Sequence, residues 1–484
     1  MIWTILLLFN VILFFLLFSD RTRSKREPPL DKGIIPWLGH ALDFGKDAAK
    51  FLTRMRMKHG DIFTVRVAGR YVTVLLDPRS FDSVIRDTTS LDFSRYAQIL
   101  MERIFGLQLP NHSSDKEKAI MRRHFHGEGL ASLNDTMQRN LRVLLTSEML
   151  PDQTDWKRDG LFNFCYSLLF RAGYLTLFGG EQNNNKTDAT NVYEDYRRFE
   201  GLLTKLARKT LKSGERQAVF SVRQRLWALL ALSGLREDSS LWLRDYRRLL
   251  REEGFDEETQ RRALLMQLWA TQGNVGPAMF WMLAYLLTHA DALTAVKKEL
   301  SRVTLPGGVF LDPKQPTPVF DSTLEETLRL TAAPFITREV LQDKTLVMAD
   351  GQEYDLRKGD RLCLFPFVSP QNDPEIHPEP EKFKYDRFLN ADGTPKSDFY
   401  KGGRRLKYYT LPWGAGRNGC MGKQFAINTM KQFVFLVLFH VDMELCDPKS
   451  GIPGFDTSRY GFGMVQPDRE MFVRYKLKAQ SRIH

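Results

Sequence analysis

The order of hydrophobic and polar residues changes several times along the chain, and each change predicts a different kind of element. Residues 62–76 alternate between apolar and polar side chains, which predicts a β-hairpin. From about residue 130 to residue 300 the apolar positions recur at helical spacing. Strand-like segments such as 362–368 follow after residue 333, and a last long helix is predicted at about 421–440. The pattern therefore predicts a mainly α-helical protein with a small β-rich lobe, of the α+β class.

The N-terminal segment is an uncharged hydrophobic run. As a helix, Met1–Phe18 would span about 27 Å, close to the thickness of a bilayer core. Basic residues follow directly, and the positive-inside rule places them in the cytosol. A cleaved signal peptide is the alternative, but no charged residue precedes the run and no small-residue cleavage site follows it. We predict a transmembrane anchor at residues 1–20, a basic and proline-rich hinge at 21–36, and one cytosolic body at 37–484.

The composition narrows the class of protein without choosing a function. With 484 residues, 43% of them hydrophobic and 26% charged, the chain is expected to bury a large core, and it is neither disordered nor collagen-like. Lys and Arg outnumber Asp and Glu by 70 to 58, a net charge of +12, which suits an anionic membrane, an acidic partner or nucleic acid. The four cysteines form no C-x-x-C pair, so we expect reduced thiols rather than a disulfide framework.

The segment 411–426, LPWGAGRNGCMGKQFA, presents one cysteine in a glycine-rich loop directly before a predicted helix. The unpaired backbone N–H groups and the positive dipole end of that helix are expected to stabilise a thiolate at Cys420. Glycines such as Gly416 remove side chains near the sulfur, so a flat and bulky partner can approach it. A thiolate is a metal ligand. For this motif alone, however, a buried cysteine in a tight loop is the alternative interpretation.

Three charged residues change the interpretation of the cysteine loop. Glu326 and Arg329 are spaced i and i+3 on one helix face, and Arg387 lies upstream of the loop. In this order and spacing they resemble the cytochrome P-450 family, in which a cysteine thiolate holds the haem iron and these charged residues lock the core beneath it. The resemblance implies a prism fold with an N-terminal transmembrane helix, haem b (iron protoporphyrin IX) as cofactor, and an endoplasmic reticulum membrane location. Residues 37–484 would then be the haem-thiolate catalytic domain.

The cysteine loop departs from the usual signature of the family at two positions. Trp413 stands where Phe is usual, and Asn418 stands where Arg or His is usual, two residues before the cysteine. Asparagine can donate a hydrogen bond to a haem propionate but cannot neutralise it, so by the resemblance Arg338 is expected to do so. The resemblance further implies haem contacts from Trp413, Gly416 and Asn418, and it makes Cys420 the axial ligand of the iron.

The long helix expected to face the haem lacks the residues with which most monooxygenases of the family deliver protons. Gly273 and Asn274 stand at the positions of the usual acid and threonine, and neither can act as a general acid near neutral pH. Pro277 lacks an N–H group, so the carbonyl of Gly273 loses its helical partner and the helix is expected to open there. A purely structural kink is the alternative. A substrate that already contains an O–O bond would need no such proton relay.

The resemblance to one branch of the family is carried by residues 35–55, 268–281, 329–340 and 458–467 and covers nearly the whole chain, both departures included. This branch isomerises prostaglandin H2 to prostacyclin (prostaglandin I2). The resemblance implies homolysis of the endoperoxide O–O bond without O2, NADPH or an obligatory reductase. It implies that Cys420 and Asn274 are catalytic, Asn274 by hydrogen bonding to the endoperoxide. Substrate contacts are expected from Arg103, Leu109, Asn274, Thr337, Arg338 and Arg361. We also expect a monomer at the endoplasmic reticulum membrane, functionally coupled to a cyclooxygenase that supplies the substrate and not bound to nucleic acid.

Two other functions remain open. A sterol hydroxylase of the same family branch would be a monooxygenase that needs O2, NADPH and a reductase, and Trp413 together with Asn418 weighs against it. A non-enzymatic, basic, membrane-associated binding protein would use the charge excess and bind no cofactor. Tyr96, Trp269 and Trp281 are either pocket aromatics or core residues.

Overall fold

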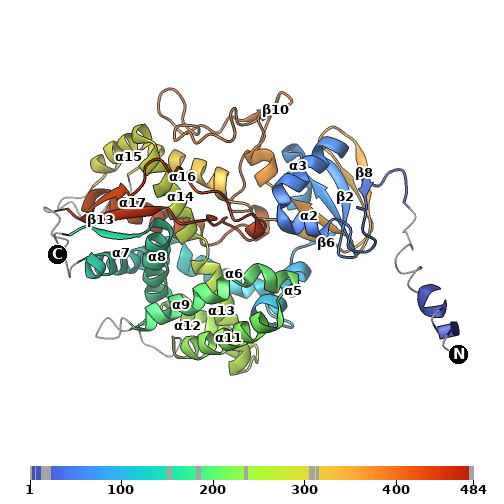
Figure 1. The fold of residues 1–484 in the computed structure, drawn as a ribbon, viewed down its shortest axis with the longest axis horizontal. Helices are drawn as coiled ribbons and strands as arrows, with labels where there is room; N and C mark the ends of the chain where they lie inside the picture. The colour runs from blue at the N-terminus through green and yellow to red at the C-terminus, as the bar shows by residue number, and fades with distance from the viewer. Residues whose placement is uncertain are drawn as a thin grey trace.

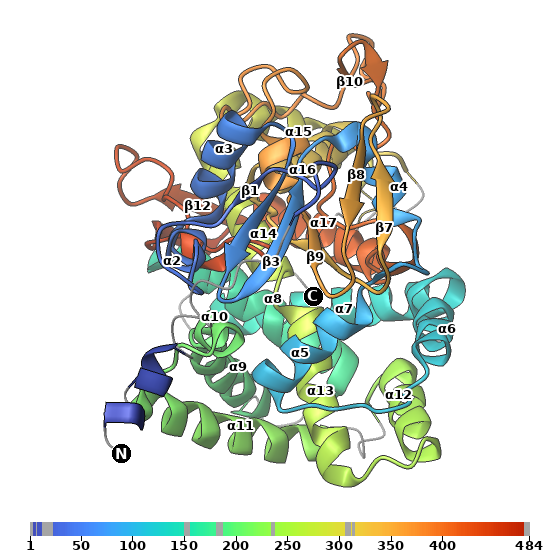
Figure 2. The same cartoon turned by 90° about the vertical axis from the view of Figure 1, so that its right-hand side faces the viewer.

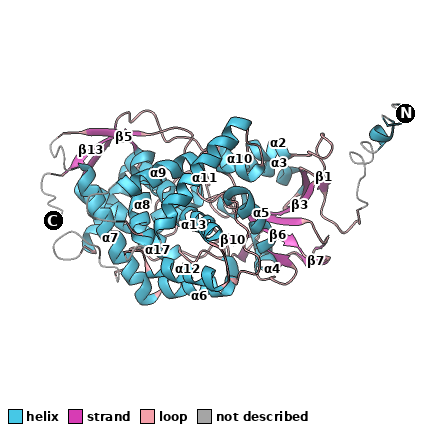
Figure 3. Cartoon of the chain, turned by 90° about the horizontal axis from the view of Figure 1, so that it is seen from below, coloured by secondary structure: helices cyan, strands magenta, loops and turns pink. Residues whose placement is uncertain are grey.

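The computed structural model describes residues 3–5, 7–11, 23–149, 155–180, 187–233, 238–304, 311 and 315–478. Helices fill most of the body, and a lobe of strands with helices α2 and α3 lies at one end, on the right in Figure 1. Strands also occur at the opposite end, with helices between the two groups (Figure 3). The predicted class, mainly α with a small β-rich lobe, is therefore confirmed.

Local sequence explains where several helices begin. Ser113, Ser240 and Asp256 precede α6, α12 and α13, and each accepts a hydrogen bond from a backbone N–H group of the first turn. The predicted last long helix is confirmed as α17, which begins two residues later than expected. The α-helices are α2 (Ala41–Lys46), α3 (Ala48–His59), α4 (Phe81–Ile85), α5 (Ser94–Phe105), α6 (Ser114–Phe125), α7 (Gly127–Met149), α8 (Leu161–Phe178), α9 (Thr187–Glu200), α10 (Leu203–Arg208), α11 (Ser213–Ser233), α12 (Leu241–Glu252), α13 (Glu257–Gln272), α14 (Val275–Thr288), α15 (Ala290–Arg302), α16 (Pro318–Thr331) and α17 (Lys423–His440).

The largest sheet has the strand order β1-β2-β3-β9-β6-β4. Its β2 and β3 are antiparallel with Val67 opposite Arg70, so the predicted hairpin is confirmed. Strands β6 and β9 are also antiparallel, which places Arg338 opposite Leu362. The strands are β1 (Leu30–Asp31), β2 (Ile62–Val67), β3 (Arg70–Leu75), β4 (Leu91–Asp92), β5 (Lys157–Gly160), β6 (Ile336–Val340), β7 (Lys344–Val347), β8 (Glu353–Leu356), β9 (Arg361–Leu364), β10 (Tyr400–Lys401), β11 (Arg404–Arg405), β12 (Val441–Leu445) and β13 (Phe472–Leu477).

The predicted anchor at 1–20 lies mostly outside the described residues. Residues 3–5 and 7–11 are helical and exposed, and they lie apart from the body in Figure 1. Part of the predicted hinge belongs to the lobe, because β1 pairs in parallel with β2. In the part of the chain that the structure describes, α8 is long and apolar enough to cross a membrane, but 83% of it is buried inside the body. That burial is typical of a core helix. The segment α13–α14 is long and apolar enough only when α15 is counted with it, and the two parts meet at an angle of 111°.

The core of the body is organised around the crossing of α8 and α14. A Cβ atom at Gly276 would lie 2.4 Å from Cδ2 of Tyr166, so the close approach of these two helices requires glycine. Helix α5 contacts β6 on one side and α13 on the other, and Figure 2 shows it between the sheet lobe and the helical part of the body. Helix α5 and strand β6, which carry Arg103, Thr337 and Arg338, therefore meet where the lobe joins the helices.

Candidate active site

Cys420 lies in the loop between the short 3-10 turn Gly416–Asn418 and α17. Its backbone N–H group donates to the carbonyl of Trp413 at 2.9 Å, which closes the loop. The residue is exposed to solvent on one side, but the protein atoms packed around the sulfur disfavour a charge there and raise the pKa of the thiol. This effect outweighs the hydrogen bonds from the N–H groups of Gly422 and Lys423 and the positive charge of Lys423, which lower the pKa. The expected stabilisation by the helix N-terminus is therefore present but smaller than the effect of burial. A metal ion bound to the sulfur would displace the proton.

The other predicted residues of the loop lie in different surroundings. Trp413 is half-buried and packs against the main core. Gly416 has a φ of +65°, and a Cβ atom there would lie 2.9 Å from Cγ2 of Ile85, so packing against α4 requires glycine. Asn418 is exposed, and its side chain has no hydrogen-bond partner among the residues that the structure describes. The structure thus gives Gly416 a packing role that the sequence pattern did not predict.

Arg338 on β6 is a buried cation without a carboxylate partner in the described part of the chain. It is 4% exposed, it donates to the carbonyl of Thr337 at 3.0 Å, and its guanidinium lies 5.5 Å from the centre of the Phe93 ring. Burial lowers its pKa, and the charge of Asp92 opposes this effect only in part. A buried charge without a partner is unfavourable. A ligand carboxylate, such as a haem propionate, would supply the missing partner.

A basic residue on α6 was missed by the sequence analysis. Lys118 is half-buried, and burial together with the charges of Arg417 and Arg122 lowers its pKa. Arg417, in the cysteine loop, donates to Asp115 of α6 at 2.7 Å, so helix and loop are held together. The spacing of Asp115, Lys118 and Arg122 places them on one helix face, and this was the signal that could have identified them. Lys118 is therefore a second candidate to meet an anionic group beside Cys420.

Glu326, Arg329 and Arg387 form one buried cluster. Glu326 accepts from Arg329 at 2.7 and 2.9 Å and from Nε of Arg387 at 3.0 and 2.9 Å. Arg329 also donates to the carbonyl of Gln371 at 2.7 Å, and the side chain of Gln371 donates back to the carbonyl of Arg329 at 2.9 Å. The spacing in the sequence thus corresponds to a real contact, and the cluster joins α16 to two later segments of the chain, at Gln371 and at Arg387.

The long helix opens at the position expected from Pro277. Helix α13 ends at Gln272 and α14 begins at Val275, and the carbonyl of Gly273 lies 3.4 Å from the hydroxyl of Tyr166. The predicted break is therefore confirmed. A hydroxyl group occupies the place of the helical N–H donor that Pro277 lacks.

Asn274 lies in this break and is half-buried. Its Oδ1 accepts a hydrogen bond from the backbone N–H of Met464 at 3.0 Å. Because a backbone N–H group can donate only to the oxygen, this bond fixes the orientation of the amide. The Nδ2 group then keeps its two donors, which have no partner among the described residues. The break thus presents a neutral hydrogen-bond donor at the position where the resemblance leads us to expect a proton relay in most monooxygenases of the family.

The remaining predicted residues gather around α5. Arg361 on β9 lies over the ring of Tyr96 at 4.9 Å, and Arg103 on α5 donates to the carbonyl of Ala207 at 2.9 Å. Arg208, which the sequence analysis missed, acts electrostatically on Tyr96 together with Arg103 and Arg361. None of these three arginines forms an ion pair within the described residues. The cluster is therefore positively charged and suits a carboxylate.

The other predicted wall and aromatic residues lie largely in the core. Thr337 is buried, with its hydroxyl 3.8 Å from Sγ of Cys363. Leu109 is half-buried in the loop after α5 and packs against the main core, as does Trp269. Trp281 is fully buried and donates to the carbonyl of Val465 at 2.8 Å. The structure therefore places Trp281 as a core residue.

His112 in the loop between α5 and α6 is clamped by two carboxylates, Glu117 at 2.7 Å and Glu253 at 2.5 Å. Burial alone would lower the pKa of His112, but these two hydrogen bonds outweigh it and raise the pKa. The contribution of His112 to stability is then fully present at pH values below its pKa in the unfolded chain, about 6.5. It is lost as the pH rises through the higher pKa of His112 in the folded protein. We expect His112→Gln to lower the free energy of unfolding by about 2 kcal/mol near pH 6 and by less at alkaline pH. Urea unfolding at both pH values measures this, and an equal loss at both would contradict it.

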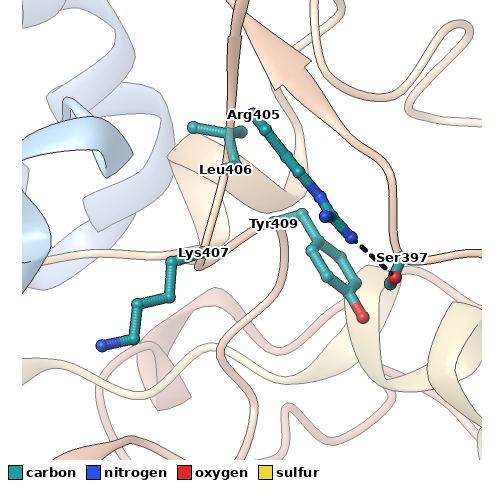
Figure 4. A pocket seen from close by; sticks show the side chains of 5 residues that line it. All are labelled: Ser397, Arg405, Leu406, Lys407 and Tyr409. Atoms are coloured by element: carbon teal, nitrogen blue, oxygen red, sulfur yellow. Dashed lines mark hydrogen bonds between the residues drawn. The ribbon is translucent and has the colours of Figure 1, made fainter.

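A surface pocket of about 390 Å³ lies elsewhere. Arg405 donates to Ser397 at 3.2 Å across it, and Leu406, Lys407 and Tyr409 complete its lining (Figure 4). None of the predicted catalytic or binding residues lines this pocket. It is therefore not the candidate active site.

The residues around Cys420 fit a haem. In the described ranges, no group of three His, Cys, Asp or Glu side chains could hold a metal ion. A metal at Cys420 would thus find fewer than three such ligands in the described part of the chain, whereas a porphyrin would bring ligands of its own. Arg338 is a buried cation that lacks a carboxylate partner, and Lys118 is a further cation beside the loop. Both suit the propionate groups of such a cofactor.

Comparison with known proteins identifies the family. The family model for cytochrome P450 matches residues 28–473. Prostacyclin synthase from Homo sapiens is 52% identical over 480 residues, which cover 94% of this chain and 95% of the relative. Prostacyclin synthase from Bos taurus is also 52% identical over 480 residues, with the same coverage of both chains. The 7-alpha-hydroxycholest-4-en-3-one 12-alpha-hydroxylase from Homo sapiens is 43% identical over 474 residues, 94% of each chain. The chain therefore belongs to the cytochrome P450 family and is a haem-thiolate enzyme of that family.

Proposed function

We propose that this enzyme is an isomerase that converts prostaglandin H2 to prostacyclin with haem b as cofactor, and that it uses no O2, NADPH or reductase. The observation that carries the proposal is the amide of Asn274, which replaces a proton relay at the break between α13 and α14 and keeps two free donors. Relatives that are 52% identical over 94% of the chain are named prostacyclin synthase, which supports the same conclusion.

The contacts of the described residues support a separate role for each of them in binding the haem. Haem bound through Cys420 supplies a ferric centre that can cleave an O–O bond without external electrons. Arg338, with Lys118 and Asn418, would hold its propionates, and Trp413 and Gly416 shape the loop beneath it. Donors on a fixed frame stabilise a developing charge or orient a lone pair without reorganising.

The substrate would be held by groups on both sides of α5. The donors of Asn274 would orient an endoperoxide oxygen. Arg103, Arg208 and Arg361 would bind the substrate carboxylate, because none of them has a carboxylate partner in the described part of the chain. Leu109 and Thr337 would form part of the wall.

The decisive experiment mixes the haem-loaded enzyme with prostaglandin H2 in the absence of NADPH. Rapid formation of the hydrolysis product of prostacyclin is the expected result. A strict requirement for NADPH and a reductase, with turnover of a sterol, would overturn the proposal. It would instead support a sterol 12α-hydroxylase, the second candidate, which the relative that is 43% identical favours.

The role of Asn274 is tested by two substitutions. Asn274→Asp keeps an oxygen for the Met464 N–H but removes the donors, whereas Asn274→Ala removes both. Each is expected to lower the kcat of isomerisation by about 10- to 100-fold, since misplacing a reacting group by about 1 Å has an effect of this size. Asn428→Ala on α17, another half-buried asparagine, is the matched control and is expected to behave like the wild type. Full activity of Asn274→Asp would contradict the assigned role.

We also propose that the protein is a monomer in the endoplasmic reticulum membrane, with anchor 1–20, hinge 21–36 and cytosolic catalytic domain 37–484, and that a cyclooxygenase supplies its substrate. Exposed apolar side chains at the end of the hinge and the start of the body support membrane contact, because Ile34 is 98% exposed and Trp37 and Leu42 are also exposed. Carbonate extraction of microsomes and protease digestion from the cytosolic side test this topology. Release by carbonate, or protection of the body from the protease, would contradict it.

A further inference from the structure

Glu200, the last residue of α9, is a buried carboxylate that the proposed reaction does not use. It is 1% exposed. Its Oε1 accepts from the hydroxyl of Tyr166, from Nη2 of Arg459 and from Nε2 of Gln466, each at 2.9 Å. Its Oε2 accepts from Arg197. A buried charge with this number of donors fixes the positions of the groups around it.

Two of these donors belong to one C-terminal segment, residues 459–466. Arg459 begins the segment and Gln466 ends it, so Glu200 fastens it at both ends. Between them, the N–H group of Met464 donates to Oδ1 of Asn274 at 3.0 Å. Gly463 has a φ of +94°, and a Cβ atom there would lie 2.3 Å from the same oxygen. The segment therefore lies directly against the amide of Asn274.

Glu200 is also connected to the helix break through Tyr166. The hydroxyl of Tyr166 lies 2.9 Å from Glu200 and 3.4 Å from the carbonyl of Gly273. The ring of Tyr166 is held in turn by the guanidinium of Arg197, 4.7 Å from its centre. The single hydrogen of the Tyr166 hydroxyl goes to Glu200, which is the nearer acceptor, and so Glu200 fixes the hydroxyl that lies against the carbonyl of Gly273. Glu200 thus holds both the segment 459–466, which is bonded to the Asn274 amide, and the ring next to the residue before it.

We propose that Glu200 is a positioning residue, which orients the donors of Asn274 by fixing the segment 459–466 and the hydroxyl of Tyr166. This inference rests on the proposed function, because it assigns Asn274 to the endoperoxide. The donors to Glu200 are all side chains of this protein. A role confined to global stability would leave the coupling between Glu200 and Asn274 at zero.

The test compares Glu200→Gln, Asn274→Ala and the double variant as full-length, haem-loaded enzymes. Glutamine has the same size, but its NH2 group faces donors from Arg197 or Arg459, so the segment is expected to loosen. We expect an unchanged carbon monoxide spectrum, a kcat for prostaglandin H2 about 10- to 100-fold lower and a nearly unchanged KM. Because Glu200 acts through Asn274, the double variant should match Asn274→Ala within about twofold. Amide hydrogen exchange at Met464 should become faster in Glu200→Gln.

Glu299→Gln is the matched control, since Glu299 is half-buried and accepts from the N–H groups of Val319 and Phe320, away from the break. It should leave kcat and the Met464 exchange unchanged. If Glu200→Gln does not fold, Gln466→Leu takes its place, because it removes one donor to Glu200 and no charge. The double variant of Gln466→Leu and Asn274→Ala should then again have the kcat of Asn274→Ala alone. Wild-type kcat, or losses that multiply in the double variant, would overturn the inference. If the wild type fails to isomerise prostaglandin H2, the proposed function fails, whereas unchanged Met464 exchange in the folded variant refutes the positioning role by itself.

Discussion

Cys420→Ser is expected to abolish isomerisation, with a loss of about 1000-fold or more, or roughly 4 kcal/mol of barrier. A serine hydroxyl keeps the hydrogen-bonding shape of the loop, but it loses the proton far less readily than a thiol and does not replace a thiolate as an iron ligand. Carbon monoxide added to the reduced wild type should shift the Soret band to the position typical of thiolate ligation. The variant should lack that band.

The control for this substitution is Cys446→Ser, because Cys446 is another free and exposed cysteine and it lies at the far end of α17, after β12. It should keep both the thiolate band and the activity. A thiolate band that survives in Cys420→Ser would show that another sulfur holds the iron. The assignment of the site would then be wrong.

Glu326→Gln is expected to lower the free energy of unfolding by about 3 to 5 kcal/mol, which is the usual loss when one charged partner of a buried ion pair is removed. Glu326 and Arg329 are completely buried, and Arg387 is nearly so. Without the carboxylate, two guanidinium groups remain in the interior with one amide oxygen and backbone carbonyls as acceptors, and no negative charge faces them. The midpoint of urea unfolding and the haem content after expression measure the loss.

The matched control is Glu444→Gln, since Glu444 pairs with Arg474 at 2.6 Å while both side chains are about half exposed. An exposed pair of this kind contributes at most about 1 kcal/mol. The two variants therefore separate the effect of burial from that of ion pairing as such. Equal losses in both would contradict the role of the buried cluster.

Local patterns in the sequence predicted the parts of the site whose cause is local. Pro277 removes one N–H group, so the break at Gly273 and Asn274 follows from one residue and helix geometry. Glu326 and Arg329 are one helical turn apart, and their contact follows from that spacing. Cys420 precedes a helix, and the N–H groups that face its sulfur follow as well. The extent to which that sulfur is buried cannot be predicted from the local sequence, because it depends on the packing of the whole loop.

The interactions that the sequence did not predict join distant segments. Glu200 meets Arg459 and Gln466, which lie in a different part of the chain. In the sequence each of these residues is an ordinary polar residue of a helix or loop. The pair of Arg417 with Asp115 and the contact of Gly416 with Ile85 are of the same kind. Such contacts depend on the tertiary fold, and neither periodicity nor motif spacing contains them.

The oxygen of the Asn274 amide is already occupied by the N–H group of Met464. A ligand atom that approaches the Nδ2 side of this amide therefore meets hydrogen atoms only. An ether or peroxide oxygen, which has lone pairs and no hydrogen of its own, is fully satisfied there. A hydroxyl group could accept the same bond, but its own hydrogen would find no acceptor on that side of the amide. The main chain of a remote loop thus fixes which side of Asn274 carries the donors, and that side suits aprotic oxygen functions better than alcohols.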